Sequence, residues 1–153
     1  MSTTEQIREA IATTLETVTD IGVVHRYERY AHQAGPLAAL YGWEGQLRGW
    51  HIRRVAVSES RLDTAPEIVT RWEIRGYLAL ADAAETELTM DALIDAARAA
   101  FRADPTLGGT VATTAAEGVV GLQLADSGPV LFGGVLCHKA VLTLNTRQYG
   151  LDE

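Results

Sequence analysis

Two neighbouring segments in the middle of the chain alternate apolar and polar residues as strands do. They run from Trp50 to about Ser60 and from Ile68 to Leu80, with residues 61–66 between them. Along the second segment every other residue points to one face, and most of those residues are apolar. The pattern predicts a long antiparallel hairpin, with strands beyond the roughly five or six residues of an average strand.

The apolar face of the first of these strands shifts by one residue after Ile52. A β-bulge at Arg53 and Arg54 explains the shift, because one extra residue turns every later side chain to the other face. With Ile52 placed opposite Ile74, we expect both arginines to face Glu73.

Helical spacing of apolar residues predicts a first main helix over residues 4–17. Two pairs offer a capping box at its start, Ser2 with Glu5 and Thr3 with Gln6. Either pair satisfies backbone N–H groups that the first turn of a helix leaves without a partner.

A second main helix is predicted over residues 87–102 and ends before Asp104-Pro105. Two shorter elements precede the long hairpin: a strand over residues 23–27 and a helical turn over 37–41, with Pro36 in the favoured first position. The buried stripe of the second main helix is predicted to consist of Met90, Leu93, Ile94, Ala97 and Phe101.

The last part of the chain is predicted to hold a loop and a second pair of strands. The loop covers residues 107–116 and is rich in Gly, Thr and Ala. Strands are expected over residues 117–125 and 131–145, joined across 126–129.

This order of elements predicts one α+β domain over residues 1–153. We expect a largely antiparallel or mixed β-sheet with a long hairpin, and two main helices packed on one of its faces. The sequence shows no internal repeat and no linker that would divide the chain.

The composition, with 47% hydrophobic and 22% charged residues, is ordinary for a soluble globular domain. The net charge of −7 argues against a nucleic-acid binder that relies on a basic surface. All but Lys139 of the 13 basic residues are arginine, which suits contacts with carboxylates, although a GC-rich gene gives the same bias. With no secretory signal and no apolar run of about 20 residues, we expect a cytoplasmic protein without a membrane segment.

No residues stand at a spacing typical of catalysis, cofactor binding or metal binding. The four histidines are far apart in sequence, and Cys137 lies on the opposite strand face from His138. The glycine pairs at 108–109 and 133–134 lack the neighbours of a phosphate-binding loop, so we interpret them as turn or bulge glycines. We therefore expect no catalytic, cofactor-binding or metal-binding residues, and no cofactor.

Several motifs follow one another in a characteristic order. They are Gly-Trp-His-Ile-Arg-Arg at 49–54, Trp-Glu-Ile-Arg-Gly-Tyr at 72–77, Leu-Ile-Asp opening 93–101, Leu-Gly-Gly at 107–109, and Gly-Val-Leu-Cys-His opening 134–144. In this order they resemble the tail terminator (tail completion) proteins of long-tailed phages, the family of the lambda-type minor tail protein U. The resemblance covers nearly the whole chain.

The resemblance implies a structural virion protein and not an enzyme. It implies a ring, usually a hexamer, that caps the completed tail tube, stops its polymerisation and offers a surface for docking the head. The implied partners are further copies of the chain, the tail tube protein and a head-side connector or completion protein, while DNA only passes through the lumen. The implied location is the tail of a virion assembled in the host cytoplasm, with no membrane contact.

A head-to-tail ring needs two different, complementary patches on each subunit. The arginines of the hairpin and the acidic faces of the helices supply opposite charges for such patches. The loop over 107–116 is expected to have no anchoring packing of its own, so that a neighbour orders it. The residues expected at these interfaces are Arg53, Arg54, Arg61, Leu62, Asp63, Arg71, Arg75, Leu107, Gly108 and Gly109.

An alternative is a small α+β enzyme or ligand-binding domain. Its site would use the concave face of the sheet, with His51, Tyr77 and His138 as polar lining. A third class is a non-viral scaffold or toxin-system subunit, which shares the ring but not the tail partner.

Overall fold

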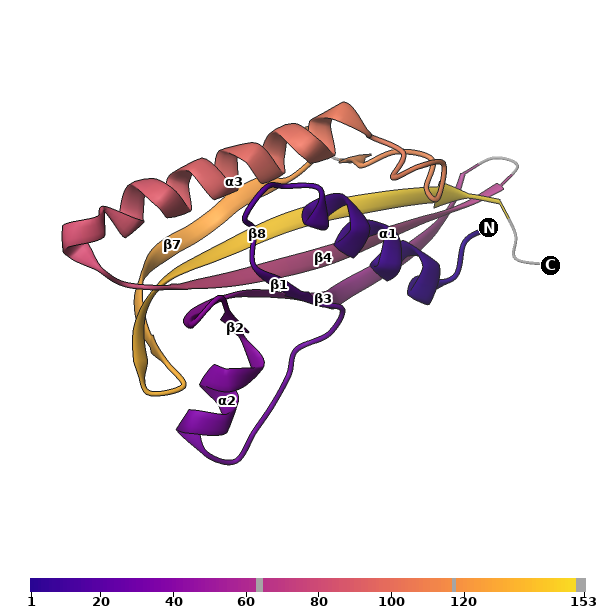
Figure 1. Cartoon of the computed structure of the whole chain (residues 1–153). Helices are drawn as coiled ribbons and strands as arrows, with labels where there is room; N and C mark the ends of the chain where they lie inside the picture. The colour runs from indigo at the N-terminus through magenta and orange to yellow at the C-terminus, as the bar shows by residue number, and fades with distance from the viewer. Residues whose placement is uncertain (63–64, 117, 151–153) are drawn as a thin grey trace.

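The computed structural model describes residues 1–62, 65–116 and 118–150, and it confirms the predicted α+β class. A curved sheet runs along the molecule beneath two long helices (Figure 1). The helices are α1 (Thr4–Glu16), α2 (Ala34–Leu40), the short 3-10 helix η1 (Asp82–Ala84) and α3 (Thr86–Ala103). The strands are β1 (Val23–His25), β2 (Gly42–Trp43), β3 (Gln46–Leu62), β4 (Ala65–Ala79), β5 (Ala115–Ala116), β6 (Val119–Val120), β7 (Gln123–Phe132) and β8 (Val135–Tyr149).

The main sheet has the strand order β1-β3-β4-β8-β7, and β2 pairs with the start of β3. β1 runs parallel to β3, and the other pairs are antiparallel, so the sheet is mixed. β5 and β6 form a separate two-stranded sheet. The two edges of the main path are therefore formed by β1 with β3 on one side and by β7 on the other.

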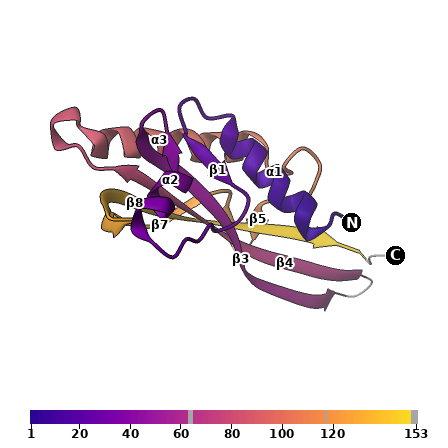
Figure 2. The same ribbon diagram turned by 60° about the horizontal axis from the view of Figure 1, so that its bottom comes forward.

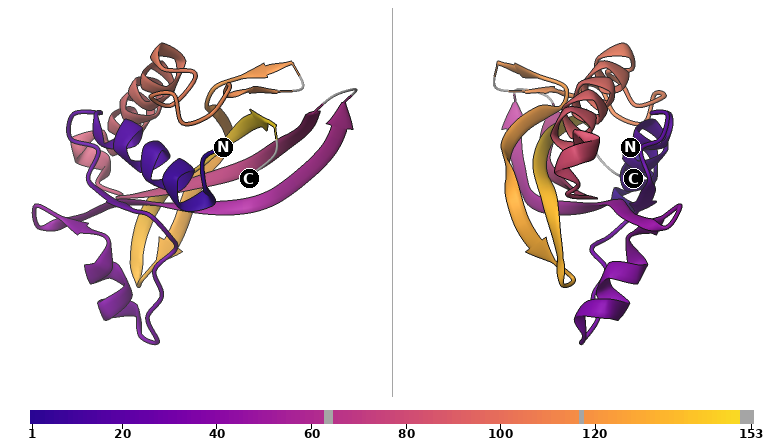
Figure 3. Two further views of the ribbon diagram at one scale, coloured as in Figure 1. Left: turned by 90° about the vertical axis from the view of Figure 1, so that its right-hand side faces the viewer. Right: turned by 60° about the vertical axis from the view of Figure 1, so that its left-hand side comes forward.

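Both main helices pack on one face of the sheet, as predicted (Figure 3). α1 begins at the capping box of Thr3 and Gln6, whose reciprocal hydrogen bonds are 3.1 and 2.8 Å long. The predicted stripe of α3 is buried along its whole length. The helices thus bury the apolar side of the strands, and this layer is the main core.

Two tryptophans fill the centre of this core, and each finds a hydrogen-bond acceptor. Trp50 is 1% exposed and donates to the carbonyl of Ile21 (2.8 Å), while Trp72 is fully buried and donates to Thr146 Oγ1 (3.0 Å). Gly76 leaves room for the Trp50 ring, since a Cβ at that position would lie 2.2 Å from it.

The opposite face of the sheet is covered only in part, by α2 and the segment before it. A second cluster of buried residues forms there, made of Tyr41, Leu47, Tyr77 and Cys137. α2 begins earlier than the predicted helical turn, at Ala34, so Pro36 lies within its first turn and not at its first position. The backbone nitrogens of a first turn need no helical partner, so proline is tolerated there.

The strands of the long hairpin extend further than predicted. β3 continues through Arg61 to Leu62 and β4 begins at Ala65, so most of the expected connection is strand. Pro66 lies within β4, where its carbonyl accepts a hydrogen bond from the N–H of Gly150 (3.0 Å). Pro66 indicated a turn in the sequence, but in the structure it is part of a paired strand.

The predicted bulge of β3 is present, but its predicted position at Arg53 and Arg54 is wrong, because the extra residue is Val55. Arg53 pairs with Glu73 as expected, but Arg54 pairs with Trp72. Because neighbouring residues of a strand alternate in direction, Arg54 points to the helix-covered face and does not face Glu73. The hydrophobic pattern detects the shift of face but does not fix which neighbouring residue is the extra one.

The C-terminal hairpin turns at Gly133 and Gly134, so the predicted connection across 126–129 is wrong. Both glycines have positive φ angles, 58° and 78°, as a tight two-residue hairpin turn requires. Residues 126–129 instead continue β7, an edge strand, which is the position in a sheet that tolerates Pro129. The strand expected over 117–125 is represented by β6 and the start of β7, and residue 117 lies outside the described residues.

Residues 107–116 pack against the domain, so the prediction that this loop has no packing of its own is wrong. Leu107 and Val111 are 2% and 5% exposed and belong to the main core. An antiparallel bridge joins Thr113 to Arg147 of β8. Two apolar side chains are enough to anchor a segment whose composition is otherwise small and polar.

Candidate functional site

The β3–β4 hairpin continues well beyond the part of the sheet that the helices cover (Figure 2). We call residues 53–62 of β3 and 65–71 of β4 the arm. Every residue from Arg53 to Arg61 is exposed, whereas Trp50 and Ile52 on the same strand are buried. The outer strand of the arm is therefore surface on both of its faces.

The outer edge of the arm pairs with no other strand in the described part of the chain. β1 pairs with β3 only from Gly49 to His51, and β2 pairs still earlier, at Gln46 and Leu47. From Arg53 onward, no strand of the described chain pairs with the outer side of β3. Such an edge binds a further element unless something covers it.

The arginines of the arm point to both of its faces. From the strand register, Arg54 and Arg61 lie on the helix-covered side, and Arg53 and Arg71 lie on the other. All four are exposed. Arg53 contacts Glu28 (Nη1 to Oε1 3.4 Å), while the other three form no ion pair with a described residue. The arm is thus a positively charged projection.

Acidic residues offset half of this charge, because the arm carries Glu59 and Glu67 beside its four arginines. Glu59 is exposed on the arm, and Glu67 is paired with Arg147 (2.6 Å). Arg75, another predicted interface residue, lies nearer the core and pairs with Glu73 (2.5 Å). Arg75 therefore belongs to the base of the arm and not to its free part.

The remaining predicted interface residues have different positions. Leu107 is buried in the main core, so its side chain is not available to a neighbouring subunit. Gly108 and Gly109 follow it and are exposed. Leu62 ends β3, and Asp63 lies outside the described residues.

A shallow groove of about 250 Å³ lies at the base of the arm, where β1 ends. Arg8 reaches into this region from α1 and donates through Nη1 to the carbonyls of Arg26 (2.8 Å) and Ile52 (3.0 Å). Partial burial and the nearby charge of Arg54 lower the pKa of Arg8. The groove is lined by Arg8, Tyr27, Glu28, Tyr30, Ile52, Arg53 and Arg54.

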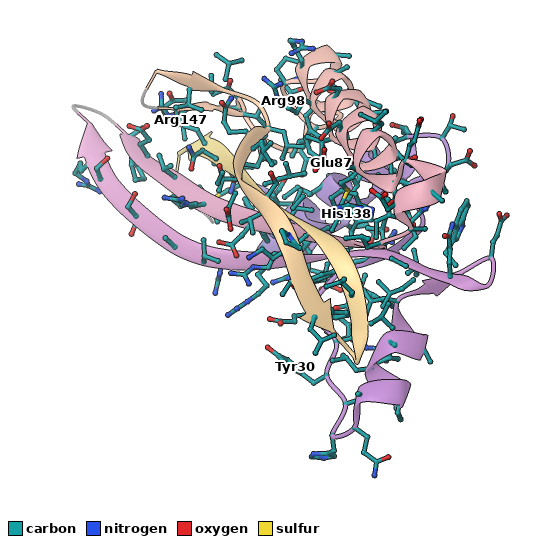
Figure 4. All side chains as sticks on the ribbon, turned by 90° about the vertical axis from the view of Figure 1, so that its left-hand side faces the viewer. Tyr30, Glu87, Arg98, His138 and Arg147 are labelled. Atoms are coloured by element: carbon teal, nitrogen blue, oxygen red, sulfur yellow. The ribbon has the colours of Figure 1, made fainter. Side chains whose placement is uncertain are left out.

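Two tyrosines make this groove resemble a protein-binding surface. Tyr27 and Tyr30 are 58% and 74% exposed, and Tyr30 projects from the segment between β1 and α2 (Figure 4). Tyrosine and arginine are enriched at the energetic centres of protein interfaces. Arg8 and both tyrosines were not among the predicted interface residues, although the two charged residues between Tyr27 and Tyr30 are a signal that could have identified the tyrosines.

A surface of the opposite charge lies at the other end of the molecule. Figure 1 places the first turns of α3 at one end and the far ends of β3 and β4 at the other. The exposed side chains at that end of α3 and on η1 carry no base before Arg98. We call the following residues the acidic surface: Asp82, Glu85, Glu87, Asp91 and Asp95.

A groove of about 170 Å³ runs between α3 and β7 beside the acidic surface. Glu87 and Asp91 line it, together with Pro129 and His138. Figure 4 shows Glu87 and His138 close together under the start of α3. His138 Nε2 is 2.7 Å from Thr86 Oγ1, so this histidine links β8 to the first residue of α3.

Of the three polar residues expected to line a concave pocket, only two come together. His51 and Tyr77 lie under α2, on the face opposite to His138. His51 is fully buried, with its Nδ1 2.9 Å from the hydroxyl of Tyr41, and burial lowers its pKa to about 4. Burial likewise raises the pKa of the Cys137 thiol to about 11. These groups form part of the packing between α2 and the sheet.

Among residues 1–62, 65–116 and 118–150, no three His, Cys, Asp or Glu side chains gather as a metal site would require. No helix in the same ranges is both long and apolar enough to cross a membrane. A scan against protein-family models finds no match for the sequence, and a search of curated proteins finds no significant match. The arm, the basic groove at its base and the acidic surface are the candidate interaction surfaces of the described chain.

Proposed function

We propose that this chain is a structural subunit of a ring that terminates the tail tube of a long-tailed phage or a related particle. In this role the ring caps the completed tube, stops its polymerisation and provides the docking surface for the head. The proposal combines the order of the sequence motifs with the architecture of the molecule. The observation that carries it is the arm, a long strand pair that no part of the described chain covers along its outer edge.

The arm supports an assembly role for energetic reasons. A strand that is exposed on both faces from Arg53 to Arg61 gains little from hydrophobic burial within one copy of the chain. Its ordering costs about 1–2 kcal/mol per residue in backbone entropy, a cost that contacts with a partner help to offset. A neighbouring subunit that covers the arm would supply those contacts.

The charge distribution supports a ring over a symmetric dimer. A two-fold dimer brings identical patches together, whereas a ring joins two different patches of each subunit. Here the basic arm and the acidic surface have opposite signs and lie at opposite ends of the molecule (Figure 1). Such an arrangement favours head-to-tail contact between copies.

The overall charge fits passage of DNA without binding to it. The chain carries a net charge of −7, so a closed ring of several copies has a strongly negative field. This field would repel DNA within the lumen. The proposed partners are the tail tube protein on one side of the ring and a head-side completion protein on the other, in a virion tail assembled in the host cytoplasm.

Tube growth provides the test. Purified chain is added to polymerising tail tube protein encoded beside its gene, and tube lengths are measured by negative-stain microscopy. We expect shorter tubes that end in a ring and grow no further when more tube protein is added. Unchanged tube lengths, together with bare tube ends, would contradict the proposed function.

A further inference from the structure

We propose that the arm of one copy docks on the acidic surface of α3 of a second copy, with the basic groove at the base of the arm receiving carboxylates of that helix. This contact rests on the proposed function, because it is the head-to-tail contact of the ring. The partner that binds the arm is therefore another copy of this chain, and every subunit carries both of the surfaces that form the contact.

The two proposed contact surfaces are complementary in charge. On the arm, Arg54, Arg61 and Arg71 are exposed and form no ion pair with a described residue. On α3, Glu87 and Asp91 stand one helical turn apart, are exposed, and likewise form no ion pair with a described residue. Opposite potentials of this kind orient two surfaces and accelerate their association.

The groove at the base of the arm gives the contact a centre. Arg8 and Arg54 both line the groove, where burial and then the charge of Arg54 disfavour the charged form of Arg8. A carboxylate entering the groove would relieve this repulsion, and Tyr27 and Tyr30 would supply apolar area around it. Such a mixture of arginine and tyrosine is typical of interface hot spots.

The geometry of the two ends makes the contact intermolecular. The acidic surface and the arm lie at opposite ends of one copy in Figures 1 and 3, so the two surfaces cannot meet within a single chain. Each copy then presents an unoccupied arm at one end and an unoccupied helix at the other. Repetition of the contact leads to a closed ring or an open filament, according to the rotation between subunits.

Charge reversal on each side tests the contact. One variant carries Arg54→Glu and Arg61→Glu, and a second carries Asp91→Arg and Asp95→Arg. These four side chains are exposed, so both variants should keep the parent fold by circular dichroism. We expect each variant alone to associate about tenfold more weakly than the parent or worse, because like charges then face each other.

Mixing the two variants is the decisive step. In the mixture, acidic arms meet basic helices and basic arms meet acidic helices, so association should return to near the parent level. Arg102→Glu serves as a matched control, since it reverses an exposed arginine of α3 outside the proposed contact and should assemble normally. If a charge-reversed variant does not fold, a neutralised variant of the same residues replaces it. This is Arg54→Gln with Arg61→Gln for the arm, or Asp91→Asn with Asp95→Asn for α3.

Sedimentation velocity, with and without tail tubes as template, separates the possible outcomes. If the parent assembles and both reversed variants assemble equally well, the contact is wrong while the proposed function stands. The same conclusion follows if each variant is impaired but the mixture is not rescued. If the parent remains monomeric under both conditions, the proposed function fails and the contact fails with it.

Discussion

The covered part of the β3–β4 hairpin and its arm belong to the same two strands, yet they differ in what surrounds them. Under the helices, Trp50, Ile52 and Ile74 are 1% exposed or less. Beyond Ile52, the outer strand is exposed at every residue through Arg61. The change occurs next to the bulge at Val55, where two arginines are followed by three apolar residues and then by the polar run over 58–61.

This difference separates stability from recognition within one element. The covered part contributes the buried apolar area that stabilises the fold. The arm contributes accessible charges and an uncovered strand edge, which stabilise little in one copy but are available to another. Substitutions in the two parts should therefore have different effects.

The largest expected effect comes from Trp72→Ala in the covered part. Trp72 is fully buried and hydrogen-bonded to Thr146, so its truncation leaves a cavity and a lost partner. We expect a loss of about 3–5 kcal/mol in the free energy of unfolding, measured by chemical denaturation. Val57→Ala on the arm, where Val57 is 52% exposed, should stay within about 0.5 kcal/mol of the parent. Equal losses at both sites would remove the distinction between the two regions.

Acidification should weaken the packing between α2 and the sheet. Burial lowers the pKa of His51 from 6.5 to about 4, so the unfolded chain binds a proton at a higher pH than the folded chain does. The contribution of neutral His51 to the free energy of unfolding is fully present above pH 6.5. It is lost progressively as the pH falls to about 4. The loss amounts to about 3 kcal/mol. Denaturation curves at several pH values measure it, and His51→Phe should flatten the slope within this window.

Gly76→Ala should destabilise the sheet beneath the helices. A Cβ at residue 76 would lie 2.2 Å from the Trp50 ring, so ring and strand must move apart. Overpacking of this kind costs about 1–3 kcal/mol. Gly128→Ala on the edge strand β7 is the matched control, because no heavy atom lies within 4 Å of the added Cβ. Thermal unfolding should show a clear decrease in Tm for the first variant only.

The smallest predicted effect lies at the base of the arm. Glu73 pairs with Arg75 and stands opposite Arg53 on the neighbouring strand. Glu73→Arg places three guanidinium groups side by side and should cost about 1 kcal/mol, as for like charges across strands. Added salt should reduce that cost in denaturation experiments, since these groups are partly exposed. A variant as stable as the parent at low salt would mean that the pairing contributes nothing.

The elements in which apolar residues recur at a regular spacing were predictable from the sequence. The stripe of α3, the capping box at Thr3 and the pairing of Ile52 with Ile74 follow from apolar spacing and local chemistry, and the structure confirms each of them. Predictions from local sequence were less reliable where two turn signals competed for the same hairpin. Pro129 suggested a turn, but Gly133 and Gly134 provide the tighter one.

The candidate site was only partly predictable, because it depends on contacts between distant segments. The arm arginines were identified from the hairpin pattern. The groove, however, combines α1, the segment after β1 and β3, and no local pattern reports that Arg8 reaches the carbonyl of Ile52. Leu107 was misjudged for a related reason, since one leucine in a polar loop does not reveal whether it packs inward.

The central claim is that the chain forms a closed ring through its arm. Native mass spectrometry of the chain over a range of concentrations, alone and with tail tubes, followed by negative-stain microscopy of the same samples, tests it most directly. We predict one discrete oligomeric mass and ring-shaped particles, alone or at tube ends. A monomer at every concentration under both conditions would contradict the claim.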